Sequence, residues 1–114
     1  MQLETSPRDD ALIVTAMMER IDAAIAIQFK DDLRTVTNGE SPRVVLDLSH
    51  VDFLDSSGLG AVVAAMKLLA PAQKLELAGL GPNVEKVFRL TRMDSVFTIH
   101  STVDAAFDGV AKAS

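Results

Sequence analysis

The stretch DFLDSSGLG, residues 52–60, places three hydrogen-bonding side chains, Asp55, Ser56 and Ser57, directly before a long apolar segment. Side chains of these types can cap a helix, and a serine can also act as a nucleophile or accept a phosphoryl group. A hydrolase nucleophile would be expected within G-x-S-x-G, and the residues around Ser56 do not match that pattern. The sequence also contains no Walker motif and no dinucleotide-binding fingerprint, so it does not support an enzyme.

Helix capping alone explains part of this stretch. Serine and aspartate are favoured at helix N-caps because their oxygens accept hydrogen bonds from exposed backbone amides. However, Leu59 occupies the position where a capping box needs glutamate or glutamine, and Gly58 and Gly60 both fall in the expected first turn. Glycine costs about 0.5–1 kcal/mol relative to alanine within a helix. We therefore interpret the two glycines as keeping the backbone approachable to a phosphoryl donor or to another protein, at a helix start that favours anions.

Composition and charge narrow the class of protein. Hydrophobic residues make up 48% of the 114 residues, so we expect one domain spanning 1–114 with a single core. The formal charge of −5 argues against a nucleic-acid or anionic-membrane surface, and the absence of cysteine excludes disulfides and thiolate metal sites. His50 and His100 lack metal-ligand spacing and are interpreted as ordinary surface residues, so we expect neither a metal nor another cofactor.

No segment suggests export or membrane insertion. The first ten residues have neither a basic head nor an apolar stretch. The most apolar segment, 59–70, is interrupted by Lys67 and is too short to span a bilayer. We therefore expect a soluble, acidic, cytoplasmic protein.

The serine motif lies within an alternating order of strands and helices. Strands are expected at 2–5, 12–17, 43–48, 74–79 and 96–100, and the turn SPRDD is expected to join the first two. Helices are expected to begin at four places, which are Asp22, Ser57, Pro82 and either Ser101 or Thr102. The first should stop at Asn38-Gly39, and the last carries an apolar stripe of Val103, Phe107 and Val110. The order β-β-α-β-α-β-α-β-α predicts an α/β fold with a mixed, mostly parallel sheet and covering helices.

The expected helix at 57–70 has little polar surface. Its core stripe is predicted to consist of Leu59, Val62, Val63, Met66 and Leu69. The remaining apolar positions are Ala61, Ala64, Ala65 and Leu68. Two interpretations stay open: the helix is wedged between the sheet and neighbouring helices, or it presents an apolar patch to a partner.

With these elements in place, the sequence resembles the STAS domain (sulfate transporter and anti-sigma-factor antagonist), and most closely the small bacterial anti-sigma-factor antagonists. The resemblance covers essentially the whole chain and is strongest in VVLDLSHVDFLDSSGLGAVVAAM, residues 44–66. Two further segments, GLGPNVEKVFRLTRMDSVFTI at 79–99 and RIDAAIAIQFKDDL at 20–33, are similar to the family's third and first helices with their flanks. The sequence departs from the family at Glu19-Arg20, near a position that is often glycine, and at Arg92, where many relatives have glycine.

The resemblance implies partner switching. An unmodified domain of this family binds an anti-sigma factor that is also a serine kinase, and the sigma factor is released. The kinase then phosphorylates the serine after the motif aspartate, which is Ser56 here, and a serine phosphatase reverses the modification. The surface implied for partner binding comprises Asp22, Asp55, Ser57, Gly58 and Leu59. Asp22 and Asp55 are expected to flank Ser56 at one end of the sheet, on an exposed surface.

Two rival functions remain open. The first is a STAS subunit of a membrane lipid-transport complex, or of a stress or biofilm signalling assembly, that works without a sigma factor. The intact Asp-Ser-Ser-Gly motif argues against a version without phosphorylation but does not identify the pathway. The second is a nucleotide-binding or hydrolysing domain, which the lack of a phosphate loop and a general base disfavours.

Overall fold

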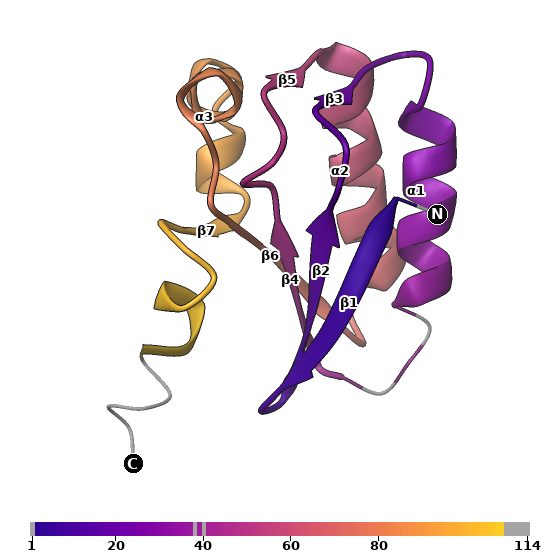
Figure 1. Ribbon diagram of the computed structural model, residues 1–114, viewed down its shortest axis with the longest axis vertical. Coiled ribbons are helices and arrows are strands. Elements are labelled where there is room, and N and C mark those ends of the chain that lie inside the picture. The colour runs from indigo at the N-terminus through magenta and orange to yellow at the C-terminus, as the bar shows by residue number, and fades with distance from the viewer. Residues whose placement is uncertain (1, 38, 40, 109–114) are drawn as a thin grey trace.

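The computed structural model describes residues 2–37, 39 and 41–108. Its main sheet has five strands in the order β1-β2-β4-β6-β7, with β1 antiparallel to β2 and the other neighbours parallel (Figure 1). The strands are β1 (Leu3–Arg8), β2 (Ala11–Ala16), β4 (Arg43–Asp47), β6 (Lys74–Ala78) and β7 (Thr98–His100). The predicted α/β class, with a mostly parallel sheet and an antiparallel N-terminal edge, is confirmed. The segment predicted as an interior strand forms β4, the central strand, and its pairing ends at Asp47.

Three α-helices follow the expected order. They are α1 (Ala26–Val36), α2 (Ser56–Leu69) and α3 (Pro82–Leu90), and a short 3-10 turn, η1 (Met93–Ser95), precedes β7. Pro82 occupies the first turn of α3, as predicted, where its missing N–H would be unpaired in any case. Residues 105–108 are helical again, at the end of the described chain. Among the described residues, no helix is long and apolar enough to cross a membrane.

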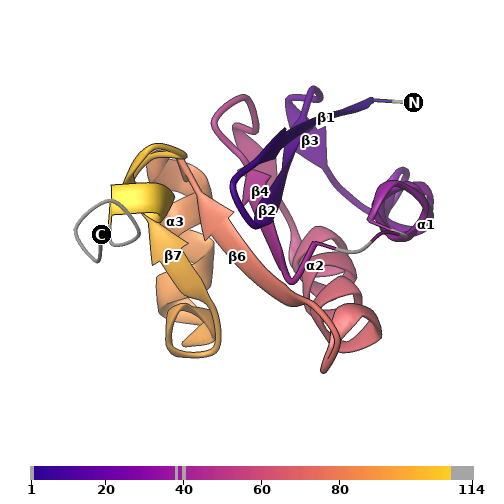
Figure 2. The same cartoon turned by 90° about the horizontal axis from the view of Figure 1, so that it is seen from below.

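The sheet separates two apolar clusters because alternate side chains of a strand point to opposite faces. Val44 and Leu46 of β4 join the larger cluster with residues of α1, α2 and α3. Figure 2 shows α1 and α2 side by side along this face. Val45 points to the opposite face, where it packs with Ala106 and Phe107 from the C-terminal helical turn. The helix-covered face therefore carries most of the core.

The first hairpin is longer than predicted. Strand pairing runs from Leu3 to Arg8 and back from Ala11, so the turn consists of Asp9 and Asp10 alone. The predicted turn residue Pro7 lies within β1, an edge strand, where a missing donor is tolerated. Asp9 adopts a positive φ of 53°, a conformation that aspartate tolerates better than most residues. The prediction of a turn over SPRDD is therefore wrong at its first half.

The segment before β7 is also less regular than predicted. The expected strand 96–100 starts only at Thr98, because η1 and the residues after it form a tight connection from α3. Phe97 is buried and its ring meets that of Phe88 edge-on at 5.8 Å. Arg92 has a φ of 61° in the left-handed region. A position of this kind favours glycine because a Cβ atom strains the backbone there.

We expect Arg92→Gly to raise the free energy of unfolding by roughly 0.5–1 kcal/mol, since relief of left-handed strain exceeds the added entropy of the unfolded chain. Urea unfolding monitored by circular dichroism would measure the change. Lys86→Gly is the matched control, because Lys86 is exposed within α3 and glycine there should lower stability by about 1 kcal/mol. Destabilisation by both variants would contradict the strain at Arg92.

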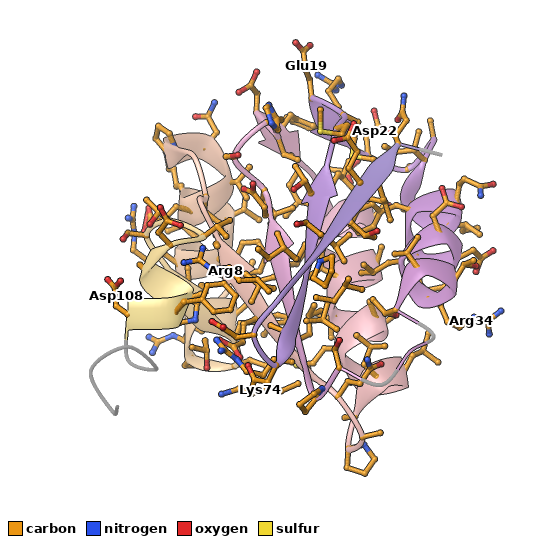
Figure 3. All side chains as sticks on the ribbon, turned by 60° about the horizontal axis from the view of Figure 1, so that its bottom comes forward. Arg8, Glu19, Asp22, Arg34, Lys74 and Asp108 are labelled. Atoms are coloured by element: carbon orange, nitrogen blue, oxygen red, sulfur yellow. The ribbon has the colours of Figure 1, made fainter. Side chains whose placement is uncertain are left out.

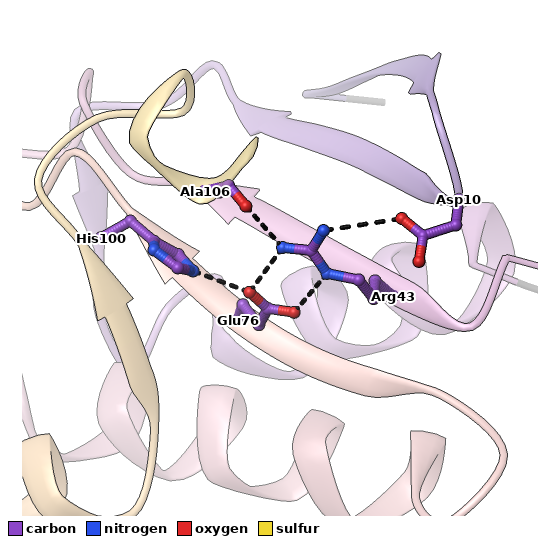
Figure 4. A network of polar contacts seen from close by, with 5 residues as sticks. All are labelled: Asp10, Arg43, Glu76, His100 and Ala106. Atoms are coloured by element: carbon purple, nitrogen blue, oxygen red, sulfur yellow. Dashed lines mark hydrogen bonds and ion pairs between the residues drawn. The ribbon is translucent and has the colours of Figure 1, made fainter. Parts of the chain in front are cut away.

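A polar network lies on the sheet face opposite α1 and α2 (Figure 4). The Glu76 side chain is only 4% exposed, and its oxygens accept from Arg43 Nε at 2.7 Å and Arg43 Nη2 at 2.8 Å. His100 Nε2 lies 2.7 Å from Glu76 Oε1. Burial opposes ionisation of Glu76, but the hydrogen bonds from Arg43 and His100 outweigh it and hold its pKa below the ordinary value. The interpretation of His100 as an ordinary surface residue is therefore wrong, whereas His50 is exposed.

The same network holds the C-terminal helical turn on the sheet. Arg43 Nη2 donates to the carbonyl oxygen of Ala106 at 2.8 Å, and the guanidinium of Arg8 lies 4.3 Å above the Phe107 ring. Of the two predicted capping residues, Thr102 rather than Ser101 bonds the turn before helical residues 105–108, since Thr102 Oγ1 accepts from the amide of Ala105 at 3.1 Å. Phe107 is buried as predicted, whereas Val110 lies outside the described residues.

Candidate functional site

A second, two-stranded sheet joins the two loops that carry the predicted site. Its strands, β3 (Arg20–Ile21) and β5 (Phe53–Leu54), are parallel, with Arg20 opposite Phe53 and Ile21 opposite Leu54. The carbonyl oxygen of Glu19 accepts from the amides of residues 52 and 53 at 2.7 and 3.2 Å. We refer to β3, β5 and the residues up to the starts of α1 and α2 as the loop junction. No apolar period in the sequence indicates strands this short, and their pairing was not predicted.

Asp55 is the N-cap of α2 and also bridges to the other loop. Its Oδ1 accepts from the amide of Gly58 at 2.9 Å, and its Oδ2 accepts from the amide of Ala23 at 3.3 Å. The helix therefore begins at Ser56, one residue earlier than predicted, and the cap is the aspartate rather than a serine. The predicted neighbourhood of the two loops at one end of the sheet follows directly from this bridge.

Asp22 organises the turn before α1 without being its N-cap. Its Oδ1 accepts from the amide of Ala24 at 3.1 Å, and its carbonyl oxygen accepts from Ile25 and Ala26 at 3.1 and 2.9 Å. The helix itself starts at Ala26, after Ile25 in the cap position, so the prediction of Asp22 as N-cap is wrong by three residues. Its side chain remains 28% exposed, and Figure 3 shows Asp22 and Glu19 at the same end of the molecule, with Lys74 at the other.

The serines and their neighbours differ sharply in exposure. Ser56 and Ser57 are exposed in the first turn of α2, and within the described residues no hydrogen bond engages either hydroxyl. Gly58 is buried, and a Cβ atom there would lie 2.1 Å from the carbonyl oxygen of Ile21. Leu59 is half-buried and packs against the core. Close packing with β3 therefore explains why position 58 is glycine, and the interpretation that Gly58 keeps the backbone approachable is wrong.

Helix α2 is largely covered by its neighbours. The predicted stripe is confirmed, since Val62 and Leu69 are buried and Leu59, Val63 and Met66 are partly buried against the core. Ala61 and Ala65 are buried as well because α1 packs against α2. Its exposed apolar surface includes Leu68, which is 52% exposed at the far end from the serines. The wedged interpretation of this helix is therefore correct for most of its length.

A shallow groove of about 340 Å³ runs between the first turns of α1 and α2. Its walls include Ala26, Ile27 and Lys30 from α1 and Ser57, Gly60 and Ala64 from α2. Ile27 is 72% exposed, and a Cβ atom at Gly60 would meet nothing within 4 Å. The end of the molecule that carries the serines thus continues into an apolar groove. Among the described residues, no three His, Cys, Asp or Glu side chains gather as a metal site.

Comparison with known sequences shows the family to which the chain belongs. The family profile described as STAS domain matches residues 2–106. The chain belongs to the STAS-domain family. The protein named anti-sigma factor antagonist BtrV, from Bordetella bronchiseptica, is 30% identical over 90% of this chain and 89% of its own length. The anti-sigma-B factor antagonist of Listeria monocytogenes is 32% identical over 85% of this STAS domain and 86% of its own length.

Solved structures agree with the sequence relatives. A crystal structure of an anti-sigma factor antagonist from Mycobacterium paratuberculosis superposes on this STAS domain with a TM-score of 0.83. The two chains are 27% identical, and the match covers 96% of this chain and 92% of the other. The family and fold inferred from the sequence are therefore confirmed.

Proposed function

We propose that this STAS domain is an anti-sigma factor antagonist that acts by partner switching in the bacterial cytoplasm. In its unmodified form it binds an anti-sigma factor that is also a serine kinase. Phosphorylation of Ser56 weakens that complex, and a serine phosphatase restores binding. The observation that carries the proposal is the exposure of Ser56 at the first position of α2, directly after a capping aspartate. The antagonist would be a ligand and a substrate rather than an enzyme.

The different roles of Asp55 and Ser56 at the start of α2 support a regulatory role for the serine. The two carboxylate oxygens of Asp55 accept hydrogen bonds from a backbone amide at the N-terminus of α2 and from one in the neighbouring loop. The Ser56 hydroxyl is therefore not needed for capping and is available to a kinase. Ser57 lines the groove between α1 and α2. We therefore assign the acceptor role to Ser56 and a contact role to Ser57.

Charge and size explain how the modification would act. A phosphate adds about −1.5 to −2 charge at neutral pH, directly beside Asp55 and near Asp22. A partner surface that fits the unmodified end would meet added bulk and repulsion there. A loss of about 3 kcal/mol in binding lowers the affinity roughly a hundredfold, which is enough for a switch. The groove beside Ser57, with the exposed side chain of Ile27, extends the contact surface that we propose.

The proposal is tested by calorimetry with the anti-sigma factor encoded in the same genome. We expect Ser56→Ala to bind like the wild type and to keep its stability within about 0.5 kcal/mol, because Asp55 rather than Ser56 caps α2. Ser56→Asp should bind at least about tenfold more weakly, a difference of 1.4 kcal/mol, because it adds charge and size at the contact. Ser57→Ala is the matched control for the phosphorylation reaction. With ATP and the anti-sigma kinase, this variant should still be phosphorylated at Ser56.

Three results would count against the proposal. Equal affinities for the wild type, Ser56→Ala and Ser56→Asp would show that this position does not control binding. Phosphate transferred to Ser57 but not to Ser56, located by mass spectrometry, would move the switch to the other serine. Failure to capture any anti-sigma factor, with capture of a membrane transporter or signalling complex instead, would favour the rival STAS function.

A further inference from the structure

The outer face of the loop junction carries an arginine stacked on a phenylalanine. Ile21 and Leu54 are buried, so the alternation of the two short strands turns Arg20 and Phe53 outward. The Arg20 guanidinium carbon lies 4.2 Å from the centre of the Phe53 ring. The Arg20 side chain is 60% exposed and Phe53 is 39% exposed, so the stacked pair is accessible to solvent. This arrangement holds a positive charge at the acidic end of the molecule.

The ionic contact of Arg20 is weaker than the contacts that hold its acidic neighbours. Its Nε lies 3.5 Å from Asp22 Oδ2, at the long end of hydrogen-bond distance. Asp22 Oδ1 is engaged by the amide of Ala24, and both oxygens of Asp55 are engaged by backbone amides. The two aspartates therefore hold the backbone of the loop junction through hydrogen bonds with its amides. The guanidinium of Arg20 can exchange its carboxylate partner without the loss of those hydrogen bonds.

The register of the junction brings this cation towards the predicted phosphorylation site. The amide of Asp55 donates to the carbonyl oxygen of Ile21 at 3.4 Å, which continues the pairing of β3 with β5. Asp22 then lies opposite Asp55, and neighbouring strands are about 4.8 Å apart. Arg20 already extends along its strand as far as the Asp22 carboxylate. Ser56 follows Asp55 directly in the chain, and Asp55 Oδ2 accepts from the amide of Ala23, the residue after Asp22.

We propose that Arg20 binds the phosphoryl group of phosphorylated Ser56 and exchanges its contact with Asp22 for one with the phosphate. The inference rests on the proposed function, in which Ser56 is the residue modified. A guanidinium forms paired hydrogen bonds with a phosphate dianion, and these are stronger than a single long contact with a carboxylate. Movement of Arg20 uncovers the Phe53 ring. Phosphorylation then changes the partner surface at the junction as well as at the serine.

The second pKa of the phosphate, measured by 31P NMR, tests this proposal without a partner protein. Three proteins are prepared with phosphoserine incorporated at position 56 during translation. They are the otherwise wild-type protein, Arg20→Gln and Arg34→Gln. Arg34 is an exposed arginine in the last turn of α1, so its variant controls for the change in net charge. Figure 3 shows it away from the end marked by Asp22. The surrounding charges are the same in all three proteins, namely Glu19, Asp22, Asp52 and Asp55 at the junction and Lys30 in the neighbouring groove.

We expect the phosphate pKa to rise by at least about 0.5 unit in Arg20→Gln relative to the wild type, because an adjacent cation favours the dianion. Arg34→Gln should leave it unchanged. A second readout is the Arg20 Nε–H resonance, which should shift on phosphorylation and return when the phosphate is removed. Equal pKa values in the wild type and Arg20→Gln, or equal rises in both variants, would overturn the proposal.

The outcome is separable from that of the proposed function. The NMR titration reports contact between Arg20 and the phosphate whether or not an anti-sigma factor binds. Calorimetry reports partner switching at Ser56 whether or not Arg20 participates. A Ser56-dependent switch with an unchanged phosphate pKa in Arg20→Gln would refute the arginine contact alone.

Discussion

Replacing Glu76 with glutamine is expected to lower the free energy of unfolding by about 3 kcal/mol at neutral pH. The carboxylate is 4% exposed and is the shared acceptor for Arg43 and His100. Glutamine keeps the shape but removes the negative charge, so the Arg43 side chain, which is only 17% exposed, loses its closest counter-ion. The remaining carboxylate near Arg43, that of Asp10, lies at 3.5 Å and is largely exposed. The reason for the large effect is that a mostly buried guanidinium keeps only one carboxylate partner, which is more distant and more exposed.

Glu85→Gln is the matched control for this prediction. Glu85 also accepts two hydrogen bonds from an arginine, at 2.8 and 2.9 Å from Arg89, but both side chains of this pair are about half exposed. Solvent screens such a pair, so its loss should change stability by no more than about 0.5 kcal/mol. Urea unfolding at neutral pH compares the two variants. Similar small losses of stability in the two variants would show that burial of the ion pair does not increase its contribution to stability.

The difference in the free energy of unfolding between the wild type and Glu76→Gln should depend on pH. The pKa of Glu76 is lowered from the ordinary value of 4.5 by its hydrogen bonds, despite burial. A lowered pKa contributes stability that is fully present above the unfolded value and is lost as pH falls through the folded one. The stability difference should therefore shrink on acidification as the pH falls below about 4.5. A difference that grows below this pH would contradict the assignment.

Replacing Gly58 with alanine is expected to lower the free energy of unfolding by about 2–3 kcal/mol. The added Cβ atom would lie 2.1 Å from the backbone carbonyl oxygen of Ile21 and 2.9 Å from its carbon. Because the obstacle is backbone rather than a flexible side chain, either β3 or the first turn of α2 has to move. Movement there would also strain the contact between Asp55 and Ala23 that joins the two loops.

Gly60→Ala serves as the control, since the two glycines lie two residues apart in the same helix. A Cβ atom at Gly60 would meet nothing within 4 Å, so alanine there should raise stability by about 0.5–1 kcal/mol. Thermal unfolding of both variants measures the opposite signs. Stabilisation by both substitutions would show that α2 does not depend on a close approach to Ile21.

The sequence predicted well those features that depend on local periodicity. Apolar residues at positions 29 and 33 indicate an amphipathic helix, and the valine-rich run at 43–48 indicates a buried strand, because each pattern reflects one element facing one core. The STAS resemblance placed a serine at the start of α2, and the structure exposes Ser56 there. Phosphorylation of that serine remains a prediction.

The sequence predicted less well the helix boundaries at which a side chain competes with backbone carbonyl groups for the same amides. Asp22 and Asp55 both suit helix caps, but only Asp55 occupies the residue before its helix. Asp22 accepts from Ala24 in a turn that delays α1 by a few residues. Local composition does not distinguish these outcomes, since both aspartates bond amides two or three residues ahead.

The order of the main-sheet strands and the helices, and most of the apolar core positions, were therefore determined by the sequence itself, because burial imposes a period that is visible in one segment at a time. The serine motif was indicated by the STAS resemblance rather than by such a period. The tertiary structure alone decided the pairing of Arg20 with Phe53, the close approach of Gly58 to Ile21, and the ion pairs of Glu76 with Arg43 and His100. These contacts join residues 24 to 37 positions apart in the sequence. Their strength depends on distance and burial, which exist only once the chain has folded around one sheet.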